Sequence, residues 1–415
     1  MNGKASHTYS SLIKNSSMLY LLSIAKMVLP LITFPYLTRI LSVDGYATVV
    51  YVKSFMLYFQ IFVDFGFMLS ATKAIVEARG DHKAIDNIVS NTILARIILS
   101  TLTFLFLIPL SLSIPLLRDN ASFVFLSFIV IALSSFLVDF LFRGLEQMQE
   151  IAIRFILMKG LSTALTFILV HSDEDLYLIP VLDIISSVIA VFLILKQMKK
   201  YSVRIVTPHL KTALLNLKQS FTFFLSSVAT TAFGALNTVL IGIMLPSFQV
   251  AIWSIALQII GTIQVFFSPI IDGIYPQMIK TKSLKLIKKV ILFFVPVVIS
   301  GCVLLYFLSD LAIYIIAGNK YSASVPILRM LLPVLLFSFP AMLFGWPALG
   351  AIGRINETSM TTIASAFVQI VGLCLLIATS RFTVSNIAIL RGVTELSLLI
   401  FRARKCYKYR DDFST

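Results

Sequence analysis

The stretch Met18-Leu-Tyr-Leu-Leu-Ser-Ile-Ala-Lys-Met-Val-Leu-Pro-Leu-Ile-Thr-Phe-Pro-Tyr-Leu37 is almost wholly apolar and carries a single charge, Lys26. A mainly apolar run of about 17–25 residues is long enough to cross a bilayer as a helix. Similar runs recur along the chain and predict twelve spans, near residues 18–38, 46–70, 88–110, 121–142, 151–170, 176–195, 221–244, 249–271, 290–309, 325–349, 359–379 and 383–401. The sequence therefore predicts an all-α polytopic membrane protein.

The composition of the chain agrees with this class. Apolar residues make up 58% of the 415 residues and charged residues only 13%, whereas soluble domains are about one-quarter charged. The three cysteines fall in spans (Cys302, Cys374) or in the C-terminal tail (Cys406), so we expect neither a disulfide nor a metal site. No motif for a cofactor is present, and none is expected.

Lysines and arginines are distributed unequally between the two sets of loops. Six lie in the interior of predicted spans, and 24 of the remaining 28 fall on the side that holds both termini, among them Arg154 at the inner boundary of its span and Arg402 in the C-terminal tail. Cytoplasmic loops retain such residues, so we expect both termini in the cytoplasm. The net charge of +15 then follows from topology, and we expect no nucleic-acid partner. The four on the opposite side are Arg39, Arg118, Lys320 and Arg381.

The longest polar segment, residues 196–220, divides the predicted spans into two sets of six. We therefore expect an N-terminal lobe over residues 1–210 and a C-terminal lobe over residues 211–415 with a short basic tail. Each set has one very short external loop and an acid near the inner end of the following span, Asp64 and Asp272. Two such repeats around a central cavity are a common transporter plan.

Six cations interrupt the predicted spans. A charge in the hydrocarbon costs at least a few kcal/mol, so such residues normally face a bundle interior or a watery cavity. We expect Lys26 and Lys53 to face a cavity, while Lys159 is expected at the inner boundary. Two interpretations stay open for each of the others, because Arg96 and Arg329 are close enough to a membrane surface to snorkel there and Arg391 has Glu395 four residues later. The candidate substrate-binding residues are Lys26, Lys53, Arg96, Arg329 and Arg391.

Intramembrane acids form a second group. Asp183 has no basic residue within four positions of it, and a buried carboxylate without a partner is suited to proton coupling. A pair with a cation on another helix is the alternative. We treat Asp64, Asp183 and Glu395 as candidate ion-coupling residues.

Motifs for catalysis are missing. The chain contains no Gly-x-x-x-x-Gly-Lys-Ser/Thr loop, no His-Glu-x-x-His helix and no Gly-x-Ser-x-Gly elbow. The acidic cluster Asp173-Glu-Asp175 lies in a short external loop and is interpreted as a solvated turn. We therefore expect a transporter and not an enzyme.

Three stretches carry a resemblance to a known family. The first runs from Leu29-Pro-Leu-Ile-Thr-Phe-Pro-Tyr-Leu-Thr-Arg-Ile-Leu41 through Val63-Asp-Phe-Gly-Phe67 to Ser70-Ala-Thr-Lys73. The others are Phe142-Arg-Gly-Leu-Glu-Gln-Met148 and Ser220-Phe-Thr-Phe-Phe-Leu-Ser226. Over nearly its whole length the chain resembles bacterial O-antigen flippases of the Wzx type, in the superfamily that also contains multidrug exporters and peptidoglycan-precursor flippases.

The resemblance implies two six-helix lobes around a cavity that opens alternately to each side of the inner membrane. It also implies a cargo, an oligosaccharide linked to undecaprenyl pyrophosphate, carried from the cytoplasmic to the periplasmic leaflet for lipopolysaccharide biosynthesis. In the related peptidoglycan flippases, cations of the first two helices hold the pyrophosphate, and Lys26 and Lys53 occupy those helices here. Arg143 departs from the family's usual Gln, and Gln258 stands where the peptidoglycan flippases carry a cation.

Two other functions remain as alternatives. A drug or cation exporter of the same superfamily would need cavity carboxylates to dominate, whereas central cations outnumber them here. An O-antigen polymerase has a similar composition, but such proteins carry a large periplasmic loop, and this sequence has no loop of that size. Association with the polymerase machinery is expected for a flippase.

Overall fold

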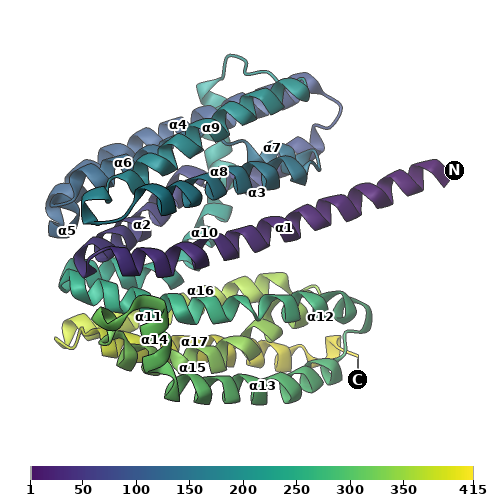
Figure 1. Cartoon of the computed structure of the whole chain (residues 1–415). Coiled ribbons are helices and arrows are strands. Elements are labelled where there is room, and N and C mark those ends of the chain that lie inside the picture. The colour runs from purple at the N-terminus through teal and green to yellow at the C-terminus, as the bar shows by residue number, and fades with distance from the viewer. Residues whose placement is uncertain (1, 415) are drawn as a thin grey trace. The chain divides into compact units, whose positions relative to one another are not determined.

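The computed structural model describes the backbone of residues 2–414 and the side chains of residues 17–18, 21–225, 227–228 and 234–414. Nearly all of this backbone is helical, and the only pairing of extended backbone in the described ranges is an isolated bridge between Ser283 and Ser414. The helices form two compact units, residues 1–228 and residues 229–415, here called unit 1 and unit 2 (Figure 1). The division falls inside one long helix.

Unit 1 contains long helices joined by short turns. Its elements are α1 (Asn2–Ile40), α2 (Val43–Asp64), α3 (Phe67–Glu77), α4 (His82–Ser113), α5 (Pro115–Arg118), α6 (Ala121–Ser134), α7 (Asp139–Gly144), α8 (Met148–Leu169), η1 (Asp173–Asp175), α9 (Leu178–Lys200) and the first part of α10 (Leu210–Met244).

Unit 2 continues from α10 in the same style. Its further elements are α11 (Ser247–Val265), α12 (Ser268–Thr281), α13 (Leu284–Phe307), α14 (Ser309–Ala317), η2 (Asn319–Tyr321), α15 (Ser324–Leu343), η3 (Phe344–Gly350), α16 (Ile355–Ala378), α17 (Val384–Lys408) and η4 (Arg410–Asp412).

Within the described residues, eleven segments are helical, long and apolar enough to cross a membrane. They correspond to eleven of the twelve expected spans. The expected span at 221–244 coincides with the second half of α10, where the side chains of residues 226 and 229–233 lie outside the described set and Gly234–Met244 is a shorter apolar helix. The prediction of an all-helical polytopic fold is therefore confirmed, with boundaries that extend a few residues beyond the apolar runs.

The same ordinal spans are interrupted in each unit. In unit 1 the second span breaks between α2 and α3, and the fourth between α6 and α7; in unit 2 the corresponding breaks separate α11 from α12 and α15 from η3. At the first break Phe65 and Gly66 both have positive φ, and a Cβ on Gly66 would lie 2.6 Å from the Cβ of Phe223. Glycine is therefore required both for the left-handed backbone and for close packing against α10.

The break before η3 is stabilised by a side chain from α17. Gly345 leaves helical geometry with ψ −112°, and Arg402 Nη1 donates a hydrogen bond to the carbonyl oxygen of Ala341 at 2.8 Å. Its Nη2 donates to Thr362 Oγ1 at 3.1 Å. Within a membrane every freed backbone carbonyl needs a partner, and Arg402 supplies one here.

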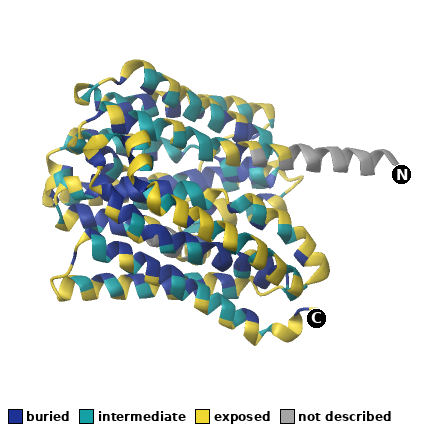
Figure 2. Cartoon of the chain, turned by 60° about the horizontal axis from the view of Figure 1, so that its bottom comes forward, coloured by how far each residue is buried: buried dark blue, intermediate teal, exposed yellow. Residues whose placement is uncertain are grey.

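Burial varies along each helix, as Figure 2 shows by the mixture of dark-blue and yellow residues. Unit 1 has a core around Ile75, Val89 and Phe142, and unit 2 has one around Met278 and Leu349. Large apolar side chains are nevertheless exposed, for example Leu292 and Phe293 of α13 at 75% and 67%. An exposed apolar surface of this extent suits contact with lipid.

Candidate functional site

Charged residues gather inside unit 1 on four different helices. Arg96 of α4 is ion-paired with Asp64 of α2, and Arg154 of α8 with Asp139 of α7. Both arginine side chains are almost fully buried, at 6% and 3% exposed. Burying a charge is costly unless a partner of opposite sign accompanies it, so each arginine depends on its carboxylate. We call these two pairs the inner cluster.

Arg96 also binds the backbone at the break in the fourth span. Its Nη1 donates a hydrogen bond to the carbonyl oxygen of Leu137 at 2.9 Å and approaches that of Ser135 at 3.5 Å. Both carbonyls belong to the turn between α6 and α7. The guanidinium of Arg96 is thus committed to one carboxylate and to freed backbone oxygens, and its contact with substrate stays a prediction.

Lys26 of α1 lies beside the inner cluster without a carboxylate of its own. Its Nζ is 5.4 Å from the centre of the Phe155 ring, a cation–π contact, and its charge acts on Asp139. The side chain is exposed. A cation over an aromatic face keeps part of its hydration and can still accept an anionic ligand.

A second group of charges, here called the outer cluster, joins α8 to α9. Lys159 Nζ lies 2.9 Å from Asp183 Oδ1, and Ser162 Oγ donates to the same oxygen at 2.6 Å. Asp183 has no basic residue near it in the sequence. In the structure its partner is Lys159 of the neighbouring helix α8, so it forms the cross-helix pair that was the alternative to a partnerless carboxylate. Lys159, expected at the inner membrane boundary, pairs with Asp183 near the start of α9.

Lys53 of α2 completes the outer cluster. It lies in a protein-rich environment where the charges of Asp183 and Lys159 both act on it, yet its side chain is exposed. An exposed lysine in the middle of a helix that is otherwise largely buried faces accessible space. The outer cluster therefore holds two ammonium groups for a single carboxylate.

The two cations of unit 2 that were expected inside spans, Arg391 and Arg329, each have a carboxylate partner. Arg391 Nη1 lies 2.9 Å from Glu395 Oε2, and both side chains are below 10% exposed. This is the pair that their spacing of four suggested. Beside them, Gln369 donates to Asn237 at 2.9 Å and accepts a hydrogen bond from Thr394 Oγ1. The result is a buried polar network that joins α10, α16 and α17.

Arg329 of α15 is held near one end of its helix. Its Nη2 lies 2.5 Å from Asp310, its Nε donates to Ser309 Oγ at 2.7 Å, and its guanidinium carbon is 5.1 Å from the centre of the Tyr306 ring. These contacts fix the guanidinium beside α14, and its role as an anchor or as a gate residue stays a prediction. Substrate binding by Arg329 or Arg391 stays a prediction.

Two arginines expected at the cytoplasmic boundary, Arg154 and Arg402, are found inside long helices. Arg154 is buried in α8 against Asp139, and Arg402 reaches from α17 to the break before η3. Arg154 lies near the start of the expected span at 151–170 and Arg402 directly follows the one at 383–401, so a count of basic residues places both on the cytoplasmic side. Asp139, an acid in the preceding apolar segment, was the available signal that Arg154 had a partner.

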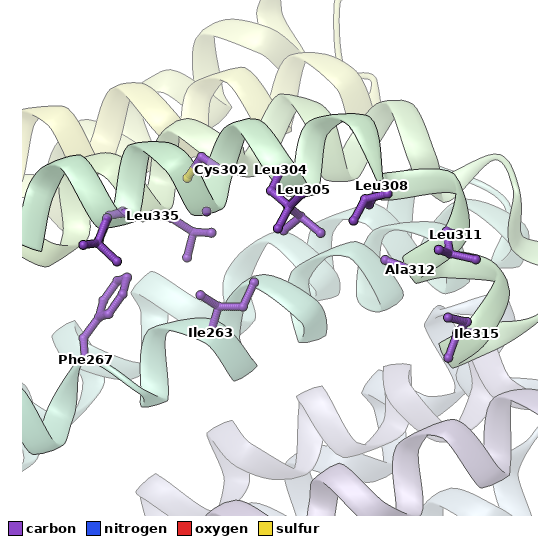
Figure 3. A pocket seen from close by; sticks show the side chains of 13 residues that line it. Ile263, Phe267, Cys302, Leu304, Leu305, Leu308, Leu311, Ala312, Ile315 and Leu335 are labelled. Carbon is purple, nitrogen blue, oxygen red and sulfur yellow. The ribbon is translucent and has the colours of Figure 1, made fainter.

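Unit 2 contains an apolar hollow in place of a charged cluster. It has a volume of about 460 Å³ and lies among α11, α13, α14 and α15. The side chains that line it are all apolar, and they include the thiol of Cys302, with Phe267 and Leu335 at one end and Ile315 at the other (Figure 3). The chemistry of this hollow suits hydrocarbon.

A protein family and two individual relatives are similar to this chain in sequence. A family model described as "Polysaccharide biosynthesis protein" matches residues 12–282. Two relatives, from Shigella dysenteriae and from Escherichia coli K12, are each named "Putative O-antigen transporter". The first is 28% identical over 325 residues, which are 75% of this chain and 79% of the relative. The second is 27% identical over 287 residues, 68% of each chain.

Solved transporter structures share the fold. An inward-facing multidrug resistance MATE family transporter of the MOP superfamily superposes with a TM-score of 0.68 at 14% identity, over 95% of this chain and 99% of that one. A MOP superfamily transporter from Pyrococcus furiosus gives 0.54 at 14% identity, over 97% of both chains. The expected relationship to O-antigen flippases is confirmed, and the solved structures show the same fold. Because the family match covers more than half of the sequence, this chain belongs to the polysaccharide biosynthesis protein family.

Proposed function

We propose that the chain flips an oligosaccharide repeat unit, linked to undecaprenyl pyrophosphate, from the cytoplasmic to the periplasmic leaflet of the bacterial inner membrane. It does so by alternating access, without catalysis, through a cationic cavity between two six-helix lobes, with both termini in the cytoplasm. The flipped unit passes to the O-antigen polymerase machinery. The names of the relatives and the transporter fold support this class of cargo and movement.

One observation carries the proposal. Of the six cations inside spans, four have a carboxylate partner: Arg96, Lys159, Arg329 and Arg391. Lys26 and Lys53 form no ion pair within the described part of the chain, and both side chains are exposed. An unpaired, accessible cation within the membrane is suited to an anionic ligand.

Pyrophosphate is the part of the cargo that these lysines would bind. Ammonium groups form charge-assisted hydrogen bonds to phosphate oxygens and replace the water that the headgroup loses. The lipid tail stays in hydrocarbon while the sugars and pyrophosphate cross. A membrane potential that is negative inside favours outward movement of an anion by about 2.3 kcal/mol per charge per 100 mV, so the potential itself supplies a driving force.

The candidate coupling acids have partners. Asp64, Asp183 and Glu395 each lie in an ion pair. Proton coupling at any of them would therefore require its pair to separate during the cycle. An exporter of organic cations would instead need accessible carboxylates without partners, so the arrangement favours an anionic cargo over a cationic drug.

The test replaces Lys26 and Lys53 by Ala, singly and together. Loss of a charged hydrogen bond of about 1.5–3 kcal/mol predicts a fall in export of roughly ten- to a hundredfold. Surface O-polysaccharide would decrease while the lipid-linked unit accumulates inside. Lys→Arg variants at the same positions separate the need for charge from the need for the lysine's shape.

Lys73→Ala is the matched control. Lys73 is also a helical lysine of unit 1, but it is 74% exposed beside Glu77. Its removal should leave export unchanged. If the Lys26 and Lys53 variants reach the membrane in normal amounts and export at the wild-type level, the cationic-cavity proposal is wrong.

A further inference from the structure

A second hollow lies on unit 1 at the end of α9, beside the loop that leads to α10. Its volume is about 510 Å³. Figure 1 shows this loop at the top of the view, where α9 ends. The lining residues used below are Phe192, Leu195, Lys196, Lys199, Arg204 and Ile205, and we call the site the basic hollow.

One face of α9 changes character along the hollow. Phe192, Leu195, Lys196 and Lys199 follow one another at helical spacings of three, one and three residues and therefore share a face. The apolar pair comes first and the basic pair last, over about 10 Å of helix axis. A phospholipid has the same order along its length, with an acyl chain toward the membrane centre and a phosphate at the surface.

The opposite wall is built by the loop and is anchored at its start. Ser202 has a φ of 57°, and the amide of Val203 donates to the carbonyl oxygen of Met198 at 2.9 Å, as in a Schellman motif. This reversal buries Val203 in the core of unit 1 and leaves Arg204 and Ile205 exposed beside the helix. The wall is therefore part of the fold.

Three side chains of α4 hold the rest of the loop. Backbone amides of the loop donate to Asp86 Oδ1 from Arg204 at 2.8 Å, to Ser90 Oγ from Val206 at 2.9 Å, and to Asn91 Oδ1 from His209 at 2.7 Å. An extended segment with its amides satisfied in this way keeps its position. The basic hollow is thus preorganised, which lowers the entropic cost of binding.

The cations of the hollow have no ion-pair partner in the described part of the chain, whereas their neighbour Lys200 has one. Lys200 Nζ lies 2.8 Å from Glu150, which also accepts hydrogen bonds from Gln197 and Tyr201. Burial and the contact with Glu150 raise the pKa of the Tyr201 phenol, so it stays neutral as a donor. Glu150 is therefore already engaged by Lys200, Gln197 and Tyr201, and Lys196, Lys199 and Arg204 are available to a ligand.

We propose that the basic hollow binds an anionic phospholipid of the cytoplasmic leaflet, with its phosphate against Lys196, Lys199 and Arg204 and an acyl chain along Phe192 and Leu195. Basic pockets at the cytoplasmic side of spans are suited to such headgroups. The leaflet rests on the orientation given under the proposed function. The hollow is lined by no Ser, Thr, Asn or Gln that would recognise sugar hydroxyls, so a plain phospholipid fits it better than the glycolipid cargo.

The test measures lipid binding to the purified full-length protein in detergent by native mass spectrometry. Phosphatidylglycerol and cardiolipin should bind at least about tenfold more tightly than phosphatidylethanolamine. The triple variant Lys196→Gln, Lys199→Gln, Arg204→Gln should lose this preference. A matched variant, Lys83→Gln, Lys211→Gln, Lys218→Gln, removes the same charge from exposed positions of unit 1 outside the hollow and should retain it.

A second variant tests the shape of the site at constant charge. Ser90→Ala with Asn91→Ala removes two of the three acceptors that hold the loop, and it should weaken phosphatidylglycerol binding while the melting temperature reports that the bundle still folds. Equal loss in the triple variant and its matched control would overturn the proposal, because the effect would be general electrostatics. Equal binding of phosphatidylethanolamine would overturn it as well.

Failure of this inference is distinguishable from failure of the proposed function. Binding is measured without the glycolipid, so a protein that does not flip lipid-linked sugars would still show it. The leaflet is checked separately with a Thr207→Cys variant, labelled in whole cells with a membrane-impermeant thiol reagent. Protection comparable to wild type supports the cytoplasmic leaflet, whereas labelling from outside would overturn that assignment.

Discussion

Unit 1 and unit 2 are interrupted at the same ordinal spans but differ in what they bury. Unit 1 holds three cross-helix ion pairs inside its spans, with Lys26 and Lys53 accessible beside them. Unit 2, in its described residues, buries the pair Arg391–Glu395 and offers a hollow lined by carbon and sulfur. The two halves share a pattern of helices without sharing chemistry. The interior of unit 1 is therefore suited to charged groups, and the apolar hollow of unit 2 is suited to hydrocarbon.

The largest effect is expected where unit 1 depends on a buried pair. Arg154→Met leaves Asp139 without its partner and should lower the free energy of unfolding by about 3–5 kcal/mol. The measurement is denaturation of the purified protein in mixed micelles, followed by circular dichroism. The double variant Arg154→Met, Asp139→Leu should regain most of this stability. A single variant as stable as the wild type would show that unit 1 does not rely on its charges.

A second prediction contrasts the packing of the two units. A Cβ on Gly144 would lie 2.5 Å from Ile75 Cγ2, whereas a Cβ on Gly301, which lines the apolar hollow, meets nothing within 4 Å. Gly144→Ala should therefore cost about 1–3 kcal/mol through overpacking. Gly301→Ala should be neutral or slightly stabilising in the same denaturation assay. Equal effects at the two positions would remove this difference between the units.

The polar network of unit 2 should contribute less than the ion pairs of unit 1. Asn237→Ala removes the oxygen that accepts a hydrogen bond from Gln369. The side chain of Gln369, on α16, is buried. Hydrogen bonds between membrane helices contribute roughly 0.6–1.7 kcal/mol, and we expect a loss of that size. Thr394→Val should give a similar loss. A value as large as that of Arg154→Met would mean that unit 2 depends on polar contacts as strongly as unit 1.

The smallest effect is expected at the boundary of unit 2. Asp310 is 71% exposed beside Arg329, and an exposed ion pair contributes at most about 1 kcal/mol. Asp310→Asn should therefore shift the melting temperature little, and the shift should vanish at high salt. Export near the wild-type level would agree with an anchoring role for Arg329, whereas a strong loss of export would argue for a gate.

The sequence was sufficient for the helical fold because hydropathy identifies spans directly. It also indicated the Arg391–Glu395 pair, since residues four apart on a helix lie on one face. The pairs Asp64–Arg96 and Lys159–Asp183 join different helices, and no local pattern states which helices meet. Their partners became evident only from tertiary packing.

The boundaries of the spans explain the remaining differences. Arg154 and Arg402 lie inside the long helices α8 and α17, although a count of basic residues places them on the cytoplasmic side. Lys26 and Lys53 were favoured by depth and by family resemblance. The structure adds the physical distinction that the sequence lacked, namely that these two are the unpaired members of the six.

Arg402 and Gly345 have a consequence for the way related sequences change. A Cβ at position 345 would lie 2.9 Å from Arg402 Nη1, so a side chain there would displace the donor from the Ala341 carbonyl. Replacing either residue alone would remove the Arg402 donor from this oxygen and leave it only the backbone amide of Phe344 as a partner in the membrane. We therefore expect the two positions to covary among homologues, with arginine at the α17 position wherever glycine interrupts the tenth span and another residue pair where that span runs straight.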